Sequence, residues 1–304
     1  MPGPITVGLD GSRESLAAAG WAAREARRRG LPLRLVHAWE GLTPVDREPD
    51  LPELAVPRHW ARRILREAEG TLAQRYPDVP VLAEQIAGAP AGALLAAAKE
   101  AGMLVLGSRG LGGVAGTLVG SVALATAAHA GCPVALVRAG EVTAEEGQLQ
   151  DEAGPPYADA AHGDVLLGLD PHSTCDALIE FAFDTAARRA APLRVLHVWR
   201  PPRAYADVPV AGYELGIDAE YEAKAREDVT TALRPWRDKN PRQPVTEDVL
   251  VGRAAGRVPV AADQAALVVV GRRIRHAALG AHLGPVAHAV IHHAHCPVVV
   301  IPHD

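Results

Sequence analysis

The strongest constraint on the fold of this chain is an internal duplication: its sequence contains two similar copies of one domain-sized segment. The segment Ile5–Asp10 recurs as Val165–Asp170. The segment Pro32–Trp39 recurs as Pro192–Trp199, so that both pairs lie 160 residues apart. Later matches share an offset of 164 residues: Gly88 with Gly252, Gly107 with Gly271, Gly120 with Gly284, and Cys132 with Cys296. Two copies of this size indicate tandem domains rather than a solenoid of short repeats.

The domain boundaries follow from the same pattern. With 304 residues, the chain is long enough for two domains of ordinary size. The stretch between the copies is rich in Gly, Pro, Glu, Asp and Ala and has no apolar period, which is typical of a solvated linker. We predict a first domain over 1–140, a linker over 141–162 and a second domain over 163–304.

Composition and charge exclude several classes of protein. The formal charge of −5 argues against a general nucleic-acid binder, which would usually be basic. Three cysteines fit a reducing cytoplasm better than a disulfide scaffold. We expect no signal peptide, because Met1–Pro4 leads straight into an apolar strand, and no apolar run is long enough to span a bilayer.

Apolar stretches and helical stretches alternate along each copy. In the first copy we expect strands over 5–9, 33–38, 80–86, 103–106 and 133–138, and helices over 13–29, 58–75, 90–101 and 120–130. Ser12 is the expected N-cap of the first helix, which closes near Gly30. This alternation predicts an α/β fold in which helices cover both faces of a parallel sheet. Asp10, Ala38 and Gly107 then share the carboxyl edge of the sheet, where such folds bind ligands.

A glycine-rich stretch, Gly107–Ser121, follows one of these strands and runs into a helix. Glycines allow close backbone approach, and a helix N-terminus offers free N–H groups to an anion, so we expect phosphate binding. The stretch is not a Walker loop, because no Gly-Lys-Ser/Thr follows. It contains Gly110-x-Gly112-x-x-Ala115, but no acidic residue for a ribose occurs before Glu141, which argues against a dinucleotide site.

The spacing Gly107-x2-Gly110-x9-Gly120-Ser121 resembles the nucleotide-binding signature of the universal stress protein family. The segments Val7–Ser12, Val36–Trp39 and Cys132–Val134 are similar to the same family. The resemblance covers both copies and suggests a tandem universal stress protein of actinobacterial type. It implies two open five-stranded parallel sheets with strand order 3-2-1-4-5.

The resemblance also implies an ATP site at the carboxyl edge of the first sheet. Asp10 would face the nucleoside, and the backbone of Ala38 would meet the adenine. The phosphate and ribose contacts would come from Gly107, Arg109, Gly110, Gly120, Ser121 and Val122. The matching positions of the second copy are Asp170, Val198, Gly271, Arg273 and Gly284. One arginine cannot offset a triphosphate, so we expect Mg²⁺ or Mn²⁺ with the nucleotide.

Simpler structural roles remain open for some of these residues. Asp10 could cap the helix that follows it, and Ser121 could be an N-cap. The two strand histidines, His37 and His197, fit packed positions better than catalytic ones, because no nucleophile is arranged beside them.

The second copy departs from the glycine signature. Its loop begins Gly271-Arg272-Arg273-Ile274, and Pro285 follows Gly284. Ile274 stands where Gly110 stands, and isoleucine disfavours a positive φ. Pro285 stands where Ser121 stands and lacks both the N–H and the hydroxyl. We predict that the second site binds ATP more weakly than the first, binds another anion or stays empty.

Histidines near the C-terminus raise the question of a metal site. His288 and His292 have the i, i+4 spacing that puts two imidazoles on one helix face, and His293, His295 and Cys296 follow. No third ligand of fixed geometry is assured, so we predict no metal there.

Three functions compete. The first is an ATP-binding stress or signalling protein without a dedicated reaction, which we favour, and the second is a nucleotide-independent interaction module. The third, a slow ATP-cleaving enzyme, lacks the expected loop after the first strand, which here reads Asp10–Arg13. Partners include ATP and a second domain paired through the last strands, 134–138 and 298–302, within one chain or in a homodimer.

Overall fold

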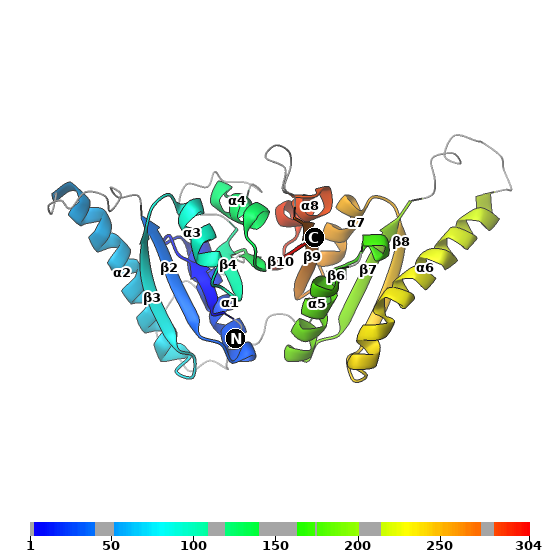
Figure 1. The fold of residues 1–304 in the computed structure, drawn as a ribbon, viewed down its shortest axis with the longest axis horizontal. Helices are drawn as coiled ribbons and strands as arrows, with labels where there is room; N and C mark the ends of the chain where they lie inside the picture. Colours follow the sequence, from blue (N-terminus) through cyan, green and yellow to red (C-terminus); the bar gives the residue numbers. More distant parts are fainter. Residues whose placement is uncertain are drawn as a thin grey trace. The chain divides into compact units, whose positions relative to one another are not determined.

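The computed structural model describes residues 3–39, 52–108, 119–139, 163–173, 175–200, 214–274 and 283–304. The chain divides into two compact units, residues 1–156 and 157–304 (Figure 1). Within the described residues, each unit contains five strands and its own covering helices.

The first unit alternates strands and helices along the chain. Its elements are β1 (Ile5–Gly8), α1 (Arg13–Arg29), β2 (Leu33–Trp39), α2 (Pro52–Arg75), β3 (Val81–Ala87), α3 (Pro90–Ala98), β4 (Met103–Gly107), α4 (Ser121–His129) and β5 (Val134–Val137). The strands are parallel and lie in the order β3-β2-β1-β4-β5. The predicted parallel sheet with order 3-2-1-4-5 is confirmed.

Helices pack on both faces of this sheet. The helices α1 and α2 contact each other and cover one face, whereas α3 and α4 pair on the opposite face (Figure 1). Strand side chains such as Val7, Leu35 and Val105 are completely buried between the two layers. This two-sided burial explains why the strands read as continuous apolar runs rather than alternating ones.

The ends of α1 match the sequence prediction, but the start of α2 does not. Ser12 caps α1 with its side chain, and Gly30 ends the helix in the left-handed conformation at φ 63°. The helix expected over 58–75 begins earlier, at Pro52. A proline fits the first turn of a helix, where its missing N–H would have no partner, so the proline-rich sequence misled the prediction.

The second unit repeats the arrangement with a changed first loop. Its elements are β6 (Val165–Gly168), η1 (Pro171–Ser173), α5 (Asp176–Arg188), β7 (Leu193–Trp199), α6 (Glu214–Lys239), β8 (Val245–Val251), α7 (Ala254–Ala262), β9 (Leu267–Arg273), α8 (Pro285–His293) and β10 (Val298–His303). The parallel strands lie in the order β8-β7-β6-β9-β10, which matches β3-β2-β1-β4-β5 of the first unit strand by strand. The short 3₁₀ helix η1 precedes α5, so α5 begins three residues later than α1 does at the offset of 160.

The helices and the cysteines bear on two questions, whether a described helix could cross a membrane and whether the cysteines form disulfides. Within the described ranges, no helix combines the length and apolar character needed to cross a membrane. Cys132, Cys175 and Cys296 are free thiols. Burial raises the pKa of the Cys132 thiol above its ordinary value, which favours the neutral form that packs in the core.

Candidate functional site

Three predicted site residues of the first unit lie at the carboxyl ends of neighbouring strands. Asp10 follows β1, Ala38 lies near the end of β2, and Gly107 ends β4. Strand β1 lies between the other two, with Gly8 opposite Val36 on one side and residues of β4 on the other. The structure therefore brings these residues to one edge, and their contact with a nucleotide stays a prediction.

One hydrogen bond joins the two ends of the glycine-rich loop, and a second joins its start to β5. The Gly120 N–H donates to the Ser108 carbonyl oxygen at 2.9 Å, and the Ser108 N–H donates to the Val137 carbonyl oxygen at 2.8 Å. The start of the loop, the end of the loop and the last strand are thus fixed together. The predicted contacts Arg109 and Gly110 lie outside the described residues.

The N-terminus of α4 lies at this closed end of the loop. Gly120 is the N-cap and makes no side-chain capping hydrogen bond, so Ser121 is the first helical residue and Val122 the second. The alternative that Ser121 caps the helix is therefore wrong. The first N–H groups of a helix have no partner within the helix, and without a capping side chain they can bind an anion such as phosphate.

Gly107 is required by helix packing rather than by a turn. A Cβ atom at this position would lie 2.8 Å from the backbone carbon of Glu14 and 2.9 Å from the Ser15 nitrogen, both in the first turn of α1. The sequence interpretation, in which this glycine lets the backbone approach a ligand, missed that contact. No local signal in the sequence announces it, because the two segments are far apart along the chain.

Asp10 orients the N-cap of α1 and is not the cap itself. Its Oδ1 accepts hydrogen bonds from the Ser12 N–H at 2.9 Å and from the Ser12 hydroxyl at 2.5 Å. The Ser12 Oγ in turn accepts from the Ser15 N–H at 3.1 Å. Gly11 supplies the positive φ of 85° that this tight turn requires. The alternative that Asp10 itself caps the helix is therefore wrong.

The two strand histidines have equivalent structural contacts. His37 Nδ1 donates to the Leu9 carbonyl oxygen at 2.8 Å, and His197 Nδ1 donates to the Leu169 carbonyl oxygen at 3.1 Å. Each histidine fixes the backbone immediately before the aspartate that follows the first strand of its unit, Asp10 or Asp170. This positioning contact supports the packed role predicted from the sequence.

The loop after β6 differs from its counterpart in the first unit. Pro171 occupies the position of Gly11, and a proline ring cannot adopt the positive φ found there. The chain instead forms η1, in which Asp170 Oδ1 accepts from the His172 N–H at 3.1 Å and the Asp170 carbonyl accepts from the Ser173 N–H at 3.0 Å. Cys175 is the N-cap of α5 and makes no side-chain capping hydrogen bond.

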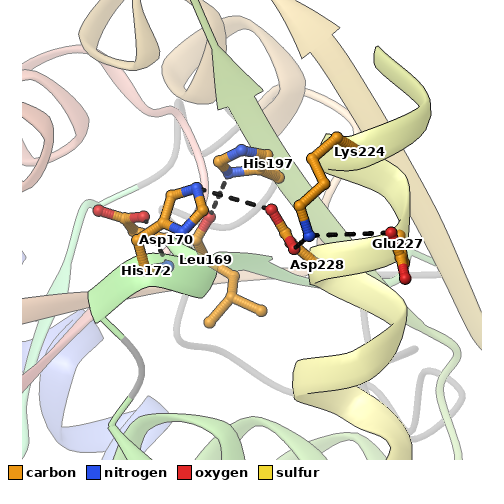
Figure 2. A network of polar contacts seen from close by, with 7 residues as sticks. All are labelled: Leu169, Asp170, His172, His197, Lys224, Glu227 and Asp228. Atoms are coloured by element: carbon orange, nitrogen blue, oxygen red, sulfur yellow. Dashed lines mark hydrogen bonds and ion pairs between the residues drawn. The ribbon is translucent and has the colours of Figure 1, made fainter. Parts of the chain in front are cut away.

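A charged network links η1 to α6 (Figure 2). Lys224 Nζ lies 2.6 Å from Asp228 Oδ1, and His172 Nε2 lies 3.8 Å from Asp228 Oδ2. The hydrogen bond from Lys224 lowers the pKa of the Asp228 carboxyl below its ordinary value. The ring of His197 meets that of His172 edge to face, with centroids 6.5 Å apart. Sequence reasoning missed this network, although the i, i+4 spacing of Lys224 and Asp228 was visible.

A hollow of the second unit lies beside this network. It is a groove of about 360 Å³ whose lining includes His172, Asp176, Asp228 and Trp236. These residues belong to η1, α5 and α6 and not to the β9–α8 connection. The described lining of the groove thus lies beside the loop that follows β6.

Strand β9 continues past the position at which the equivalent strand of the first unit, β4, ends. Strand β4 ends at Gly107, but β9 runs two residues past the matching Gly271, to Arg273. The N–H of Ile274 then donates to the His303 carbonyl oxygen at 2.5 Å. The Arg273 guanidinium donates a hydrogen bond to the Ser173 hydroxyl. The predicted cation of the second site is thus engaged by the unit's own first loop.

The other predicted residues of the second site lie at the expected strand and helix ends. Val198 is in β7 beside His197, and Gly284 is the N-cap of α8 without a side-chain capping hydrogen bond. Pro285 occupies the first helical position, as predicted. The proline removes one of the N–H groups that the first unit presents at Ser121.

The C-terminal histidines contact one another and an acid. The rings of His288 and His292 have centroids 4.4 Å apart, and His295 Nδ1 lies 2.9 Å from Asp263 Oδ1. Among the residues that the structure describes, no group of three or more His, Cys, Asp or Glu side chains is arranged to hold a metal.

Comparison with known proteins gives a consistent result. The sequence model of the universal stress protein family matches residues 1–138 and again 162–302. Universal stress protein Rv2005c of Mycobacterium tuberculosis is 33% identical over 97% of this chain and 96% of its own length, and universal stress protein Rv1996 of the same organism is 31% identical over 99% and 96%. A universal stress protein structure from Archaeoglobus fulgidus covers 99% of this chain and 97% of its own, with a TM-score of 0.67 at 16% identity, which supports the fold alone.

Proposed function

The chain belongs to the universal stress protein family, with two tandem copies of the family domain, and we propose that its first unit binds ATP in a stress-response or signalling role. The observation that carries this proposal is the hydrogen bond from Gly120 N–H to the Ser108 carbonyl oxygen. That bond holds the uncapped N-terminus of α4 beside the carboxyl edge of the sheet. An anion-binding helix end at such an edge suits the phosphates of a nucleotide.

In this proposal the phosphates and the nucleoside contact different parts of the sheet edge of the first unit. The N–H groups of Ser121 and Val122, together with the Ser121 hydroxyl, contact the phosphates, aided by Arg109 and Gly110. Asp10 and the backbone of Ala38 contact the nucleoside. A sheet edge with a nucleoside end at β1 and β2 and a phosphate end at β4 and α4 fits the extended shape of ATP.

A divalent cation is expected to accompany the phosphates. Mg²⁺ and Mn²⁺ prefer oxygen ligands, and of the proposed phosphate contacts only Ser121 contributes a side-chain oxygen. The cation would therefore be held mainly by phosphate oxygens and water, with Ser121 as the protein ligand. Its chemistry there would be to neutralise phosphate charge.

We propose binding without a dedicated reaction. The described groups at the phosphate end are N–H donors and a hydroxyl, which stabilise an oxyanion in the ground state. The two histidines at the edge use their Nδ1 atoms to hold the Leu9 and Leu169 carbonyls. Occupancy would act by changing the shape of the first unit or its choice of partner.

A nucleotide-independent role is the second candidate for the second unit. The hydrogen bond from Arg273 to Ser173 favours it, because the cation that would meet a phosphate is already engaged. The proline at the start of α8 favours it as well. We propose that this unit binds ATP more weakly than the first, binds a different anion or serves as an interaction module.

The last strand of each unit is the proposed means of association. The strands β5 and β10 are apolar and largely buried along their length. An apolar last strand suits pairing with another sheet, either within one chain or in a homodimer. Sedimentation of the purified protein across a range of concentrations would distinguish the two arrangements.

The test of the ATP proposal is to denature freshly purified protein and analyse the small molecules that it releases. We expect ATP near one per chain, lost when Gly120 and Ser121 are both replaced. Absence of nucleotide, together with no binding on titration with ATP and Mg²⁺, would favour the nucleotide-independent module. Rapid stoichiometric conversion to ADP or AMP would favour an enzyme.

A further inference from the structure

Trp60 is a large apolar side chain that α2 leaves exposed beside the first loop. Its fractional exposure is 45%, whereas Ile64, one turn later on the same helix, is 7% exposed. A Cβ atom on Gly11 would lie 2.9 Å from Ile64 Cδ1 and 4.0 Å from Trp60 Cη2. Ile64 therefore forms the inner contact with this loop, and the indole forms the outer one.

The order of the strands places this indole at the nucleoside end of the proposed site. Gly11 follows Asp10 directly, and α2 packs on β2 and β3, the strands on one side of β1. The phosphate end, at Gly107 and α4, belongs to the strands on the other side. The exposed ring thus flanks the part of the edge where Asp10 and Ala38 lie, opposite the anion-binding helix.

The second unit lacks this indole at the matching helix positions. At the offset of 164 residues, Lys224 replaces Trp60 and Asp228 replaces Ile64. These two form the 2.6 Å ion pair of the charged network in place of an apolar surface (Figure 2). Of the two units, only the first therefore offers a flat aromatic face at this helix position beside the loop.

We propose that Trp60 is a base-binding residue, whose indole packs against the purine ring of a nucleotide held by the first unit. This inference rests on the proposed function and adds to it a side chain on α2 that contacts the base. Stacking on an aromatic side chain tolerates either purine, because both have a flat π face. The exposed face of the indole would be partly covered when the base is bound.

The experiment compares two ligands on the full chain, ATP and inorganic tripolyphosphate, each with Mg²⁺. Trp60→Ala should weaken ATP binding by about tenfold, because stacking on an aromatic ring contributes at about that level. Tripolyphosphate affinity should stay unchanged, because that ligand has no base. Trp60→Phe should retain most of the ATP affinity, because phenylalanine keeps an aromatic face for the base.

Matched controls separate base contact from damage to the fold. Lys224→Ala changes the same helix position in the second unit, and Arg63→Ala changes an exposed neighbour on α2, so both should bind ATP as the parent does. The inference is wrong if Trp60→Ala binds ATP as tightly as the parent, or if it loses ATP and tripolyphosphate equally. A parent chain that binds neither ligand would overturn the proposed function and the inference with it, whereas the first two outcomes leave the proposed function standing.

Discussion

The two units have the same strand order but differ where the fourth strand of each sheet ends. In the first unit β4 stops at Gly107, and a hydrogen bond between Ser108 and Gly120 joins the ends of the following loop. In the second unit β9 continues to Arg273, whose side chain donates to Ser173. The difference shows that the local structure at one edge can change through a few residues while the sheet beneath stays the same.

The first loops show the same contrast in another form. Gly11 adopts a positive φ and packs against apolar Ile64 in the first unit. Pro171 forces a 3₁₀ turn in the second, and the matching helix position is Asp228, which pairs with Lys224. An apolar junction has thus been replaced by a charged one within the same architecture.

The largest effect should come from copying the second unit's helix start into the first. Ser121→Pro removes an N–H and a hydroxyl that are proposed to meet phosphate, and proline is tolerated at the first helical position. We expect ATP affinity to fall by about 10- to 100-fold with little change in melting temperature. Calorimetric titration of the full chain measures the loss, with Ser121→Ala as an intermediate, and parent-like affinity in the proline variant would break the comparison.

The next effect concerns the stability of the two first loops. Gly11→Ala should lower the free energy of unfolding of the first unit by about 1–3 kcal/mol, because alanine is strained at a positive φ. Its Cβ would also lie 2.9 Å from Ile64 Cδ1. The matched change Pro171→Ala should cost the second unit less than about 1 kcal/mol. Urea unfolding followed by hydrogen exchange in each unit tests this, and equal losses would contradict it.

A smaller effect is expected at the helix caps. Ser12→Ala removes the side-chain cap of α1 and a hydrogen-bond donor to Asp10, which should cost about 1 kcal/mol. His172→Ala, at the matching position, should cost about 0.5 kcal/mol or less, because the N-cap of α5 is Cys175. The same urea measurement compares them. A larger loss for the histidine variant would show that η1 caps α5 in a way that these contacts do not explain.

The smallest effect is a pH dependence confined to the second unit. The Lys224 hydrogen bond lowers the pKa of Asp228 in the folded state, so its stabilisation is complete above the ordinary carboxyl pKa. That stabilisation is lost as the pH falls through the lowered value. Asp228→Asn should therefore show a smaller drop in urea midpoint than the parent between about pH 7 and about pH 3. Asp238→Asn on the same helix serves as the control, and an unchanged drop in Asp228→Asn would refute the assignment.

The fold was predictable because its determinants are local or repeated. The duplication, the apolar strands and the caps at Ser12 and Gly30 are all visible in short stretches of sequence. The start of α2 was missed because its proline-rich first turn reads as a loop.

The parts of the site that were not predicted depend on contacts between distant segments. Gly107 faces the first turn of α1, and Arg273 meets Ser173 a hundred residues earlier in the chain. A change in one loop, Pro171 for Gly11, shifts the start of α5 and so brings Ser173 into a turn that α1 does not have. No single motif carries that information, because each contact joins two segments that are distant in the sequence and meet only in the folded chain.

The central claim is that the first unit binds ATP and the second does so weakly or not at all. Titration of the full chain with ATP and Mg²⁺ tests it directly when the parent is compared with Ser121→Pro and with Arg273→Ala. We expect one tight equivalent per chain in the parent, its loss in Ser121→Pro and its retention in Arg273→Ala. Two equal tight equivalents in the parent, or one that survives Ser121→Pro and disappears in Arg273→Ala, would contradict it.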